Sequence, residues 1–325
     1  MDAVTEIPAL EVVSLAPGTR RSFALPVVEL GDGSRLRVPV HVVVGREAGP
    51  CLAVVAGVHG DEPEGIVALD RLWREETLTE LRGTLLLVPV ANPPAFAAHQ
   101  RRSPLDGLDL NRVFPGDPRG TPSQRLARSL FELVAGNAQF LYTLHSWYAT
   151  GDALPHVESQ DGPPAREASL AGALACEFPY ARASDWHPGL FPRTISDAGI
   201  PAIECEVGGG GRLSDAYRDV TRQSVLALMR HLRMLPGTAP AAPRAIICRS
   251  LDLVATTGGM LRLAVGLGDR VAQDEEVGVV TDLHGHGRER LHAPAAGLVA
   301  ALRHAVSVGP GDIVLRLLTD TGLQR

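Results

Sequence analysis

Apolar residues in the first two-thirds of the chain gather in short runs that turns interrupt. Five of these runs have the length and the Val, Leu or Ile content of buried strands. They are Val38–Val44, Leu52–Val58, Gly83–Pro93, Ala138–Ser146 and Ile200–Val207. Continuous apolar runs of this kind are typical of strands that are covered on both faces of a sheet.

Between these runs, the apolar residues take the spacing of helices. Gly65–Leu81 carries a single apolar stripe, which predicts a helix along its length. A second helix is expected over Pro122–Ala138, with Ser123 as its N-cap, and a third over Asp215–Leu235. Strands that alternate with helices indicate an α/β domain with a largely parallel or mixed sheet.

The pattern changes after Pro236–Pro243, a stretch rich in Pro and Ala that is typical of a linker. Beyond it, short alternating runs are separated by Gly-Asp and Pro-Ala-Ala-Gly turns, and helical spacing is absent. We therefore expect an α/β domain over residues 1–237 and a smaller all-β domain over residues 244–325.

Composition narrows the class of protein. The formal net charge is −6 and no basic run occurs, so we expect no nucleic-acid partner. No apolar run approaches the ~20 residues that cross a bilayer, and the acidic N-terminus does not resemble a signal peptide. The four cysteines lie far apart without a C-x-x-C pair, which indicates free thiols in a reducing compartment. We expect a cytoplasmic protein that does not enter a membrane.

All 31 residues counted as Lys or Arg are Arg. The sequence therefore has no lysine for a Walker A motif, for a Schiff base with pyridoxal phosphate, or for attachment of biotin or lipoate. Activities that depend on such a lysine are excluded.

His59 and Glu62 stand in the charged turn GVHGDEPEG, directly after an apolar run. The turn could be a solvated acidic loop, or it could direct an imidazole and a carboxylate at one metal ion. A catalytic zinc takes three protein ligands, so a third ligand should follow another strand. His145 ends the run AQFLYTLHS and is the candidate, although a buried, hydrogen-bonded histidine is the alternative.

Two further segments carry chemistry. In PLDGLDLNRVFPG, Asn111 and Arg112 follow the pair Arg101 and Arg102 and suit a carboxylate ligand. The alternative is a surface loop in which these arginines pair with its aspartates. In IPAIECEVGGGG, the two glutamates are two residues apart, so both side chains project to the same face of a strand. One of them could act as a general base, or they could instead brace the glycine loop that follows. These glutamates are Glu204 and Glu206.

Taken in order, GVHGDEPEG, NPPAF…RRSPLDGLDLNRVFPG, LHS and ECEVGGGG resemble the succinylglutamate desuccinylase/aspartoacylase family over about Ala53 to Gly211. The resemblance implies a zinc-carboxypeptidase-like mixed sheet flanked by helices, with a C-terminal barrel-sandwich-like β domain. It also implies one zinc ion per chain and a role for each motif residue. The zinc ligands would be His59, Glu62 and His145; the general base Glu206, with Glu204 as the alternative; the carboxylate-binding pair Asn111 and Arg112; and the carbonyl-polarising residue Arg101 or Arg102.

The sequence departs from the family pattern at Thr143, where members commonly carry Asp two residues before the third ligand. A carboxylate that orients His145 is therefore not evident. The segment HPGLFPRTISDAG matches poorly, so the assignment of Arg193 to substrate contact has little support.

The expected function is zinc-dependent hydrolysis of the amide bond in a small N-acetyl or N-succinyl amino acid, or a related amide. A zinc carboxypeptidase acting on short peptides is the alternative, because the same kind of zinc site cuts C-terminal peptide bonds. A third possibility is a binding protein built around the β domain, which resembles a lipoyl or biotinyl domain without its lysine. A homo-oligomer is compatible with each of them.

Overall fold

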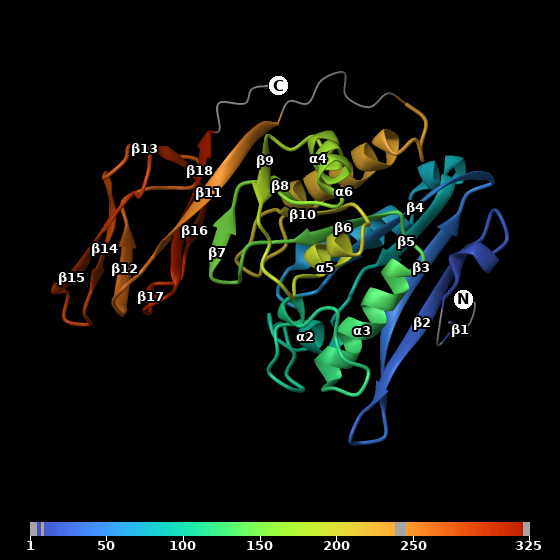
Figure 1. Ribbon diagram of the computed structural model, residues 1–325. Coiled ribbons are helices and arrows are strands. Elements are labelled where there is room, and N and C mark those ends of the chain that lie inside the picture. Colours follow the sequence, from blue (N-terminus) through green and yellow to red (C-terminus); the bar gives the residue numbers. More distant parts are fainter. Residues whose placement is uncertain (1–4, 8–9, 238–244, 321–325) are drawn as a thin grey trace.

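The computed structural model describes residues 5–7, 10–237 and 245–320. Its strands form a 14-stranded mixed sheet and a separate four-stranded sheet (Figure 1). The strands are β1 (Thr5–Glu6), β2 (Arg20–Glu29), β3 (Arg35–Val44), β4 (Glu47–Ala56), β5 (Arg82–Val88), β6 (Phe140–His145), β7 (Gly151–Ala153), β8 (His156–Gln160), β9 (Tyr180–Ser184), β10 (Ala202–Glu206), β11 (Ile246–Val254), β12 (Gly259–Leu263), β13 (Arg270–Val271), β14 (Glu276–Thr281), β15 (Gly287–His292), β16 (Gly297–Arg303), β17 (Ser307–Val308) and β18 (Ile313–Asp320).

The large sheet has the order β1-β2-β3-β5-β4-β6-β10-β8-β9-β11-β18-β16-β13, and β7 pairs with β16. At its centre β5, β4, β6 and β10 run parallel to one another. The carboxyl ends of these four strands therefore meet at one edge of the sheet, where α/β proteins assemble ligand sites.

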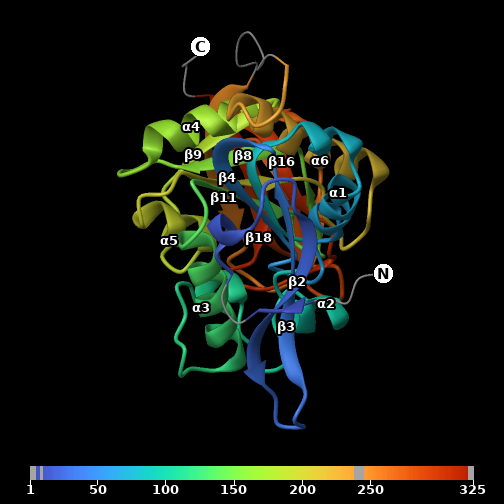
Figure 2. The ribbon, with the colours of Figure 1, turned by 90° about the vertical axis from the view of Figure 1, so that its right-hand side faces the viewer.

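Helices cover both faces of the central strands (Figures 1 and 2). Apolar residues of α1, α4 and α6 pack in one core cluster, and those of α3 and α5 pack in a second cluster on the opposite face. No helix in the described ranges is long and apolar enough to span a bilayer. The helices are α1 (Pro63–Trp73), α2 (Pro93–Ala97), α3 (Pro122–Ala135), α4 (Arg166–Ala175), α5 (Phe191–Asp197) and α6 (Asp215–His231).

The alternation of side chains in β4 explains why its sequence is continuously apolar. Leu52 and Val54 pack in the cluster that contains α1, whereas Ala53 and Val55 pack in the cluster that contains α3. Successive residues of a strand point to opposite faces, and both faces are covered here. The sequence-based expectation of an α/β fold with strands buried on both faces is confirmed.

The C-terminal residues 245–320 are all β, as the sequence predicts, and lie at one end of the molecule (left in Figure 1). They surround an apolar cluster of their own, to which Leu261, Val280 and Leu315 belong. However, β11 pairs in parallel with β9, so the large sheet continues into this region. The division at 237 and 244 stays a prediction, and most of the expected linker Pro236–Pro243 lies outside the described residues.

Four expected helix boundaries are wrong. The helix that starts near Gly65 ends at Trp73, and Glu76–Glu80 forms a separate 3₁₀ turn because Glu75 has extended backbone angles. The N-cap of α3 is Thr121 rather than Ser123: Thr121 and Gln124 form a capping box around Pro122 at the first helical position. The helices α3 and α6 end three and four residues earlier than expected, at Ala135 and His231.

Candidate functional site

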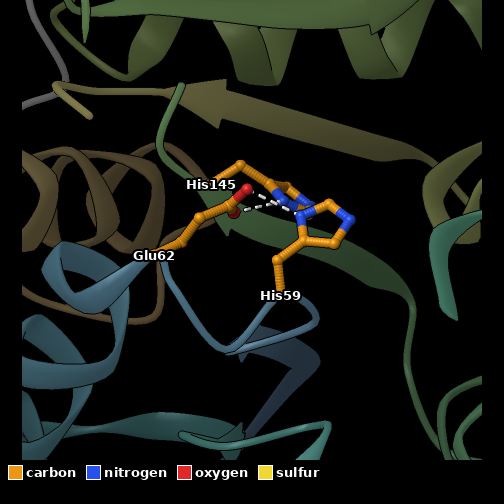
Figure 3. A group of neighbouring side chains, drawn as sticks. All are labelled: His59, Glu62 and His145. Atoms are coloured by element: carbon orange, nitrogen blue, oxygen red, sulfur yellow. Dashed lines mark hydrogen bonds and ion pairs between the residues drawn. The ribbon is translucent and has the colours of Figure 1, made fainter. Parts of the chain in front are cut away.

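His59, Glu62 and His145 converge at the carboxyl edge of the parallel strands (Figure 3). His59 and Glu62 lie between β4 and α1, and His145 is the last residue of β6. The Nδ1 atom of His59 lies 2.7 Å from one carboxylate oxygen of Glu62, and the Nδ1 atom of His145 lies 2.9 Å from the other. The three side chains are buried, and their potential ligand atoms lie within 4.8 Å of one another.

Two glycines let the chain turn sharply after β4. Gly57 has a φ of +64°, in the left-handed region that favours glycine. At Gly60, a Cβ atom would lie 2.0 Å from the backbone of Ala95, so only glycine fits between the turn and α2. Pro63 then starts α1 directly after Glu62. The sequence of the turn thus fixes His59 and Glu62 on the same side of the strand end.

Asp109 holds the second ring nitrogen of His59. Its Oδ1 atom lies 3.1 Å from His59 Nε2, and it also accepts hydrogen bonds from the Asn111 backbone and from Arg101. Burial acts to raise the pKa of Asp109, but the hydrogen bond with His59 and the charge of Arg101 hold it below its ordinary value. The sequence interpretation treated Asp109 only as an ion-pair partner of arginine; its place two residues before Asn111 was the signal for this further role.

The two glutamates of β10 lie on the same face of the sheet as His145. Glu206 is directly opposite His145 in the parallel register of β10 and β6, and Glu204 is opposite Thr143. The Oε2 atom of Glu206 is buried and has no hydrogen-bond partner within the described ranges. Burial and the charge of Glu62 raise the pKa of Glu206, so its carboxyl takes up a proton more readily than an exposed one.

Only one of the two adjacent arginines reaches this cluster. Arg101 lies 3.4 Å from a Glu62 oxygen through Nη1, and its guanidinium is 4.7 Å from the centre of the Tyr148 ring. Arg102 is exposed and contacts the Gly107 carbonyl at 3.5 Å. The structure therefore brings Arg101, and not Arg102, to the two histidines.

Asn111 and Arg112 line a cavity of about 250 Å³ together with the two histidines. The Asn111 side-chain oxygen accepts a hydrogen bond from the Phe191 backbone at 2.8 Å, which leaves its NH₂ group as a donor. Arg112 is anchored by a 2.7 Å hydrogen bond to the Asn111 carbonyl and forms no ion pair with any described carboxylate. Both side chains can therefore donate to a carboxylate in the cavity.

The cavity is also lined by charged residues that the sequence did not indicate. Arg182 of β9 lies 3.0 Å from Glu158 of β8. Arg316 of β18 is bound in a bidentate manner by Asp252, at 2.7 and 3.0 Å, and its guanidinium lies 4.7 Å from the centre of the Trp147 ring. Since β18 belongs to the C-terminal region, that region supplies part of the cavity wall.

Arg193, considered earlier as a substrate contact, does not line this cavity. It forms ion pairs with Asp197 at 2.8 Å and with Asp185 at 3.3 Å, and it donates to the Trp186 carbonyl. These contacts hold Arg193 on α5, and its assignment to substrate contact stays a prediction.

The donor set at the histidines fits a catalytic zinc ion. Zinc in such sites is held by three nitrogen or oxygen ligands and keeps one further position open. Two Nδ1 atoms and a carboxylate, buried and beside a cavity, provide these ligands. Burial acts to raise the pKa of Glu62, but the two histidines outweigh it and lower the pKa, so Glu62 is a carboxylate ready to bind a cation.

Comparisons with known proteins identify the family of the chain. The family profile described as Succinylglutamate desuccinylase/Aspartoacylase catalytic domain matches residues 48–232, more than half of the chain. A curated relative, the N-alpha-acetyl-L-2,4-diaminobutyric acid deacetylase of Halomonas elongata, is 31% identical over 85% of this chain and 84% of its own length. A succinylglutamate desuccinylase of Burkholderia lata is 38% identical, but over only 34% of this chain and 31% of its own length.

Solved structures share the fold along nearly the whole chain. A succinylglutamate desuccinylase/aspartoacylase from Rhodobacter sphaeroides superimposes with a TM-score of 0.87 at 27% identity, covering 96% of this chain and 99% of its own. The product-bound ectoine utilization protein EutE (DoeB) from Ruegeria pomeroyi superimposes with a TM-score of 0.84 at 26% identity, covering 93% and 95%. The β-rich C-terminal region is therefore part of the shared architecture.

Proposed function

The chain belongs to the succinylglutamate desuccinylase/aspartoacylase family of N-acyl amino acid deacylases, and we propose that it is a zinc-dependent deacetylase of a small N-acetyl amino acid. The observation that carries the proposal is the buried cluster of His59, Glu62 and His145, which opens into a cavity shared with Glu206 and Arg112. Ligands for a metal, a general base and a carboxylate-binding arginine thus surround one small space.

His59, Glu62 and His145 would hold the zinc ion, one per chain. When bound, zinc lowers the pKa of a water molecule toward ~7 and polarises an amide carbonyl. Asp109 keeps the Nε2 atom of His59 as the hydrogen-bonded side of the ring, so that Nδ1 faces Glu62. The orientation of His59 is therefore built into the protein before a metal binds.

Glu206 is proposed as the general base. Its buried carboxylate oxygen has no partner in the described part of the chain, and its raised pKa suits it to accept a proton from the attacking water. It then delivers that proton to the nitrogen of the leaving amine. A pKa closer to neutral pH suits both steps, because Glu206 must accept a proton from water and then release it to the amine.

Arg101 and the pair Asn111–Arg112 are proposed to bind the two polar ends of the substrate. Arg101 lies on the metal side of the cavity and donates to the carbonyl oxygen, where negative charge grows in the transition state. Arg112 and the Asn111 amide bind the carboxylate of the amino acid.

The charge balance of the cavity favours an acetyl over a succinyl group. Four arginines line it, and Arg101, Arg182 and Arg316 are each paired with carboxylates of the protein. Arg112 is the one cavity arginine without an ion pair among the described residues. A succinyl group carries a carboxylate of its own, which would need a second unpaired cation in addition to Arg112. An acetyl group is uncharged, so the substrate then needs Arg112 alone. The relative from Halomonas elongata is likewise named as a deacetylase.

The test is metal analysis of the purified protein combined with a substrate panel. We expect one zinc per chain, release of free amine from N-acetyl amino acids, weak activity on the N-succinyl analogues, and none on dipeptides. Activity should be lost after chelation and return when zinc is added. Preferential cleavage of dipeptides would instead support the carboxypeptidase alternative, and full activity of the metal-free protein would overturn the proposal.

A further inference from the structure

The two histidines of the cluster differ in what holds their outer ring nitrogen. Each directs Nδ1 at a different oxygen of Glu62, at 2.7 Å for His59 and 2.9 Å for His145. On the outer side, His59 Nε2 has Asp109 at 3.1 Å. His145 Nε2 is buried and makes no hydrogen bond with the described residues, yet an oxygen of Glu204 lies 3.9 Å from it.

The strand register explains why the carboxylate comes from β10. Thr143 precedes His145 by two residues, so both project to the same face of β6. Glu204 lies directly opposite Thr143 across the parallel pair, on that same face. The buried Thr143 hydroxyl has only a 3.5 Å contact to the Ile203 carbonyl and carries no charge. Position 143 on β6 carries no carboxylate, but Glu204 on the neighbouring strand β10 places one beside it.

No hydrogen bond within the described ranges accounts for the burial of the Glu204 side chain. Its side chain is 7% exposed, and none of the described residues donates to its carboxylate. Burying a carboxylate without a donor is costly, so a structural role alone gives no reason to retain it. A histidine that binds a metal commonly donates its outer N–H to a carboxylate, which fixes the ring and increases its basicity.

We propose that Glu204 is a positioning residue that orients His145 for zinc, as Asp109 does for His59. The proposal rests on the proposed function, since it assumes that His145 is a zinc ligand. The 3.9 Å between Glu204 Oε2 and His145 Nε2 exceeds hydrogen-bonding distance, so the Glu204 side chain would have to turn toward the ring by somewhat less than ~1 Å to make the bond. Glu204 acts through the imidazole, whereas Glu206 acts on the substrate.

The experiment measures zinc affinity by competition with a chromogenic chelator in four proteins. They are the wild type, Glu204→Leu, Glu204→Leu combined with Thr143→Asp, and Glu206→Gln as the control. Removing the outer carboxylate should weaken zinc binding about 10- to 100-fold. The added aspartate of Thr143→Asp, on the same face as His145, should recover most of that loss, and Glu206→Gln should bind zinc like the wild type.

Unfolding of the metal-free proteins checks their fold. The metal-free Glu204→Leu protein should unfold at or above the wild-type temperature, because the change removes a buried carboxyl group that accepts no hydrogen bond from the described residues. Glu204→Gln keeps a hydrogen-bond acceptor and should bind zinc with an affinity between those of the wild type and Glu204→Leu. This variant replaces Glu204→Leu in the comparison if the leucine variant does not fold. With zinc at saturation, Glu204→Gln should keep kcat within about tenfold of the wild type, a smaller loss than removal of a general base causes.

The outcomes separate the two proposals. Unchanged zinc affinity in both Glu204 variants would overturn the positioning role and leave the proposed function intact. Weaker binding that Thr143→Asp does not restore would also overturn it, because the effect would then not pass through the outer face of His145. A wild-type protein that binds no zinc would overturn the proposed function itself.

Discussion

Glu206 of β10 lies directly opposite His145 of β6 in the parallel register of the two strands. Paired residues of neighbouring strands project to the same face, so the carboxylate and the imidazole stand side by side at the sheet edge. Each residue ends its strand, and the preceding residues of both strands are buried. The pairing of two buried strands therefore brings a candidate base beside a candidate metal ligand.

Replacing Glu206 by Gln should abolish hydrolysis while zinc remains bound. The amide keeps the shape of the side chain but cannot accept the proton of the attacking water, and loss of a general base lowers kcat about 10²- to 10⁴-fold. Zinc content and kcat should be measured on the same preparation. Glu132→Gln, on the exposed side of α3, is the matched control and should keep full activity. Retained hydrolysis in Glu206→Gln would contradict the assignment of the base.

The adjacent residues Arg101 and Arg102 offer a matched pair. Arg101→Gln should lower kcat by about 10²- to 10³-fold, because a donor to the developing negative charge is lost at the transition state. Arg102→Gln should leave kcat nearly unchanged, since Arg102 is exposed and contacts only a backbone carbonyl. Steady-state kinetics with one N-acetyl amino acid compares the two. A larger loss in Arg102→Gln would reverse the assignment.

The local motifs made much of the candidate site predictable. His59 and Glu62 lie three residues apart on one turn, so the chain itself brings them together. His145 follows a different strand, but parallel buried strands end at a common edge, and that rule was enough to connect it with the turn. Two local sequence patterns and one topological rule were therefore sufficient to predict that His59, Glu62 and His145 lie together.

The remaining parts of the site depend on contacts that no local pattern encodes. Glu158 and Arg182 lie on β8 and β9, short strands with too many polar residues to stand out as buried. Their burial becomes favourable only when the two charges meet, at 3.0 Å. Arg316 lines the same cavity from β18 of the C-terminal region. It is brought there because β18 pairs with β11, and β11 pairs with β9.

Replacing Arg112 should mainly weaken the binding of substrates that carry a carboxylate. Arg112→Gln removes a charge-assisted hydrogen bond worth about 1.5–3 kcal/mol, or roughly 10- to 100-fold in kcat/KM. An N-acetyl amino acid amide, which lacks the carboxylate, should lose far less. The measurement is kcat/KM for the acid and its amide in both proteins. Equal losses for the two substrates would show that Arg112 does not contact the carboxylate.

Asp106 should make the stability of α3 depend on pH. It accepts hydrogen bonds from the backbone and the hydroxyl of Ser123, at 2.8 and 2.7 Å, in the first turn of that helix. Partial burial acts to raise the pKa of Asp106, but the bonds from Ser123 outweigh it and hold the pKa below its ordinary value. A lowered pKa means that the stabilisation is fully present above about pH 4 and is lost as the pH falls through the lowered pKa.

Asp106→Asn should therefore reduce the free energy of unfolding by about 1 kcal/mol at pH 7, the usual contribution of such a helix-end bond. The difference between the variant and the wild type should shrink as the pH falls below about 4 toward the lowered pKa of Asp106, where the carboxylate takes up a proton. Urea unfolding of the metal-free proteins at pH 7 and pH 3 measures it. Asp70→Asn is the control, because Asp70 on α1 is exposed and, among the described residues, forms an ion pair with Arg74 alone. A difference that persists unchanged at pH 3 would show that the loss comes from packing and not from the charge of Asp106.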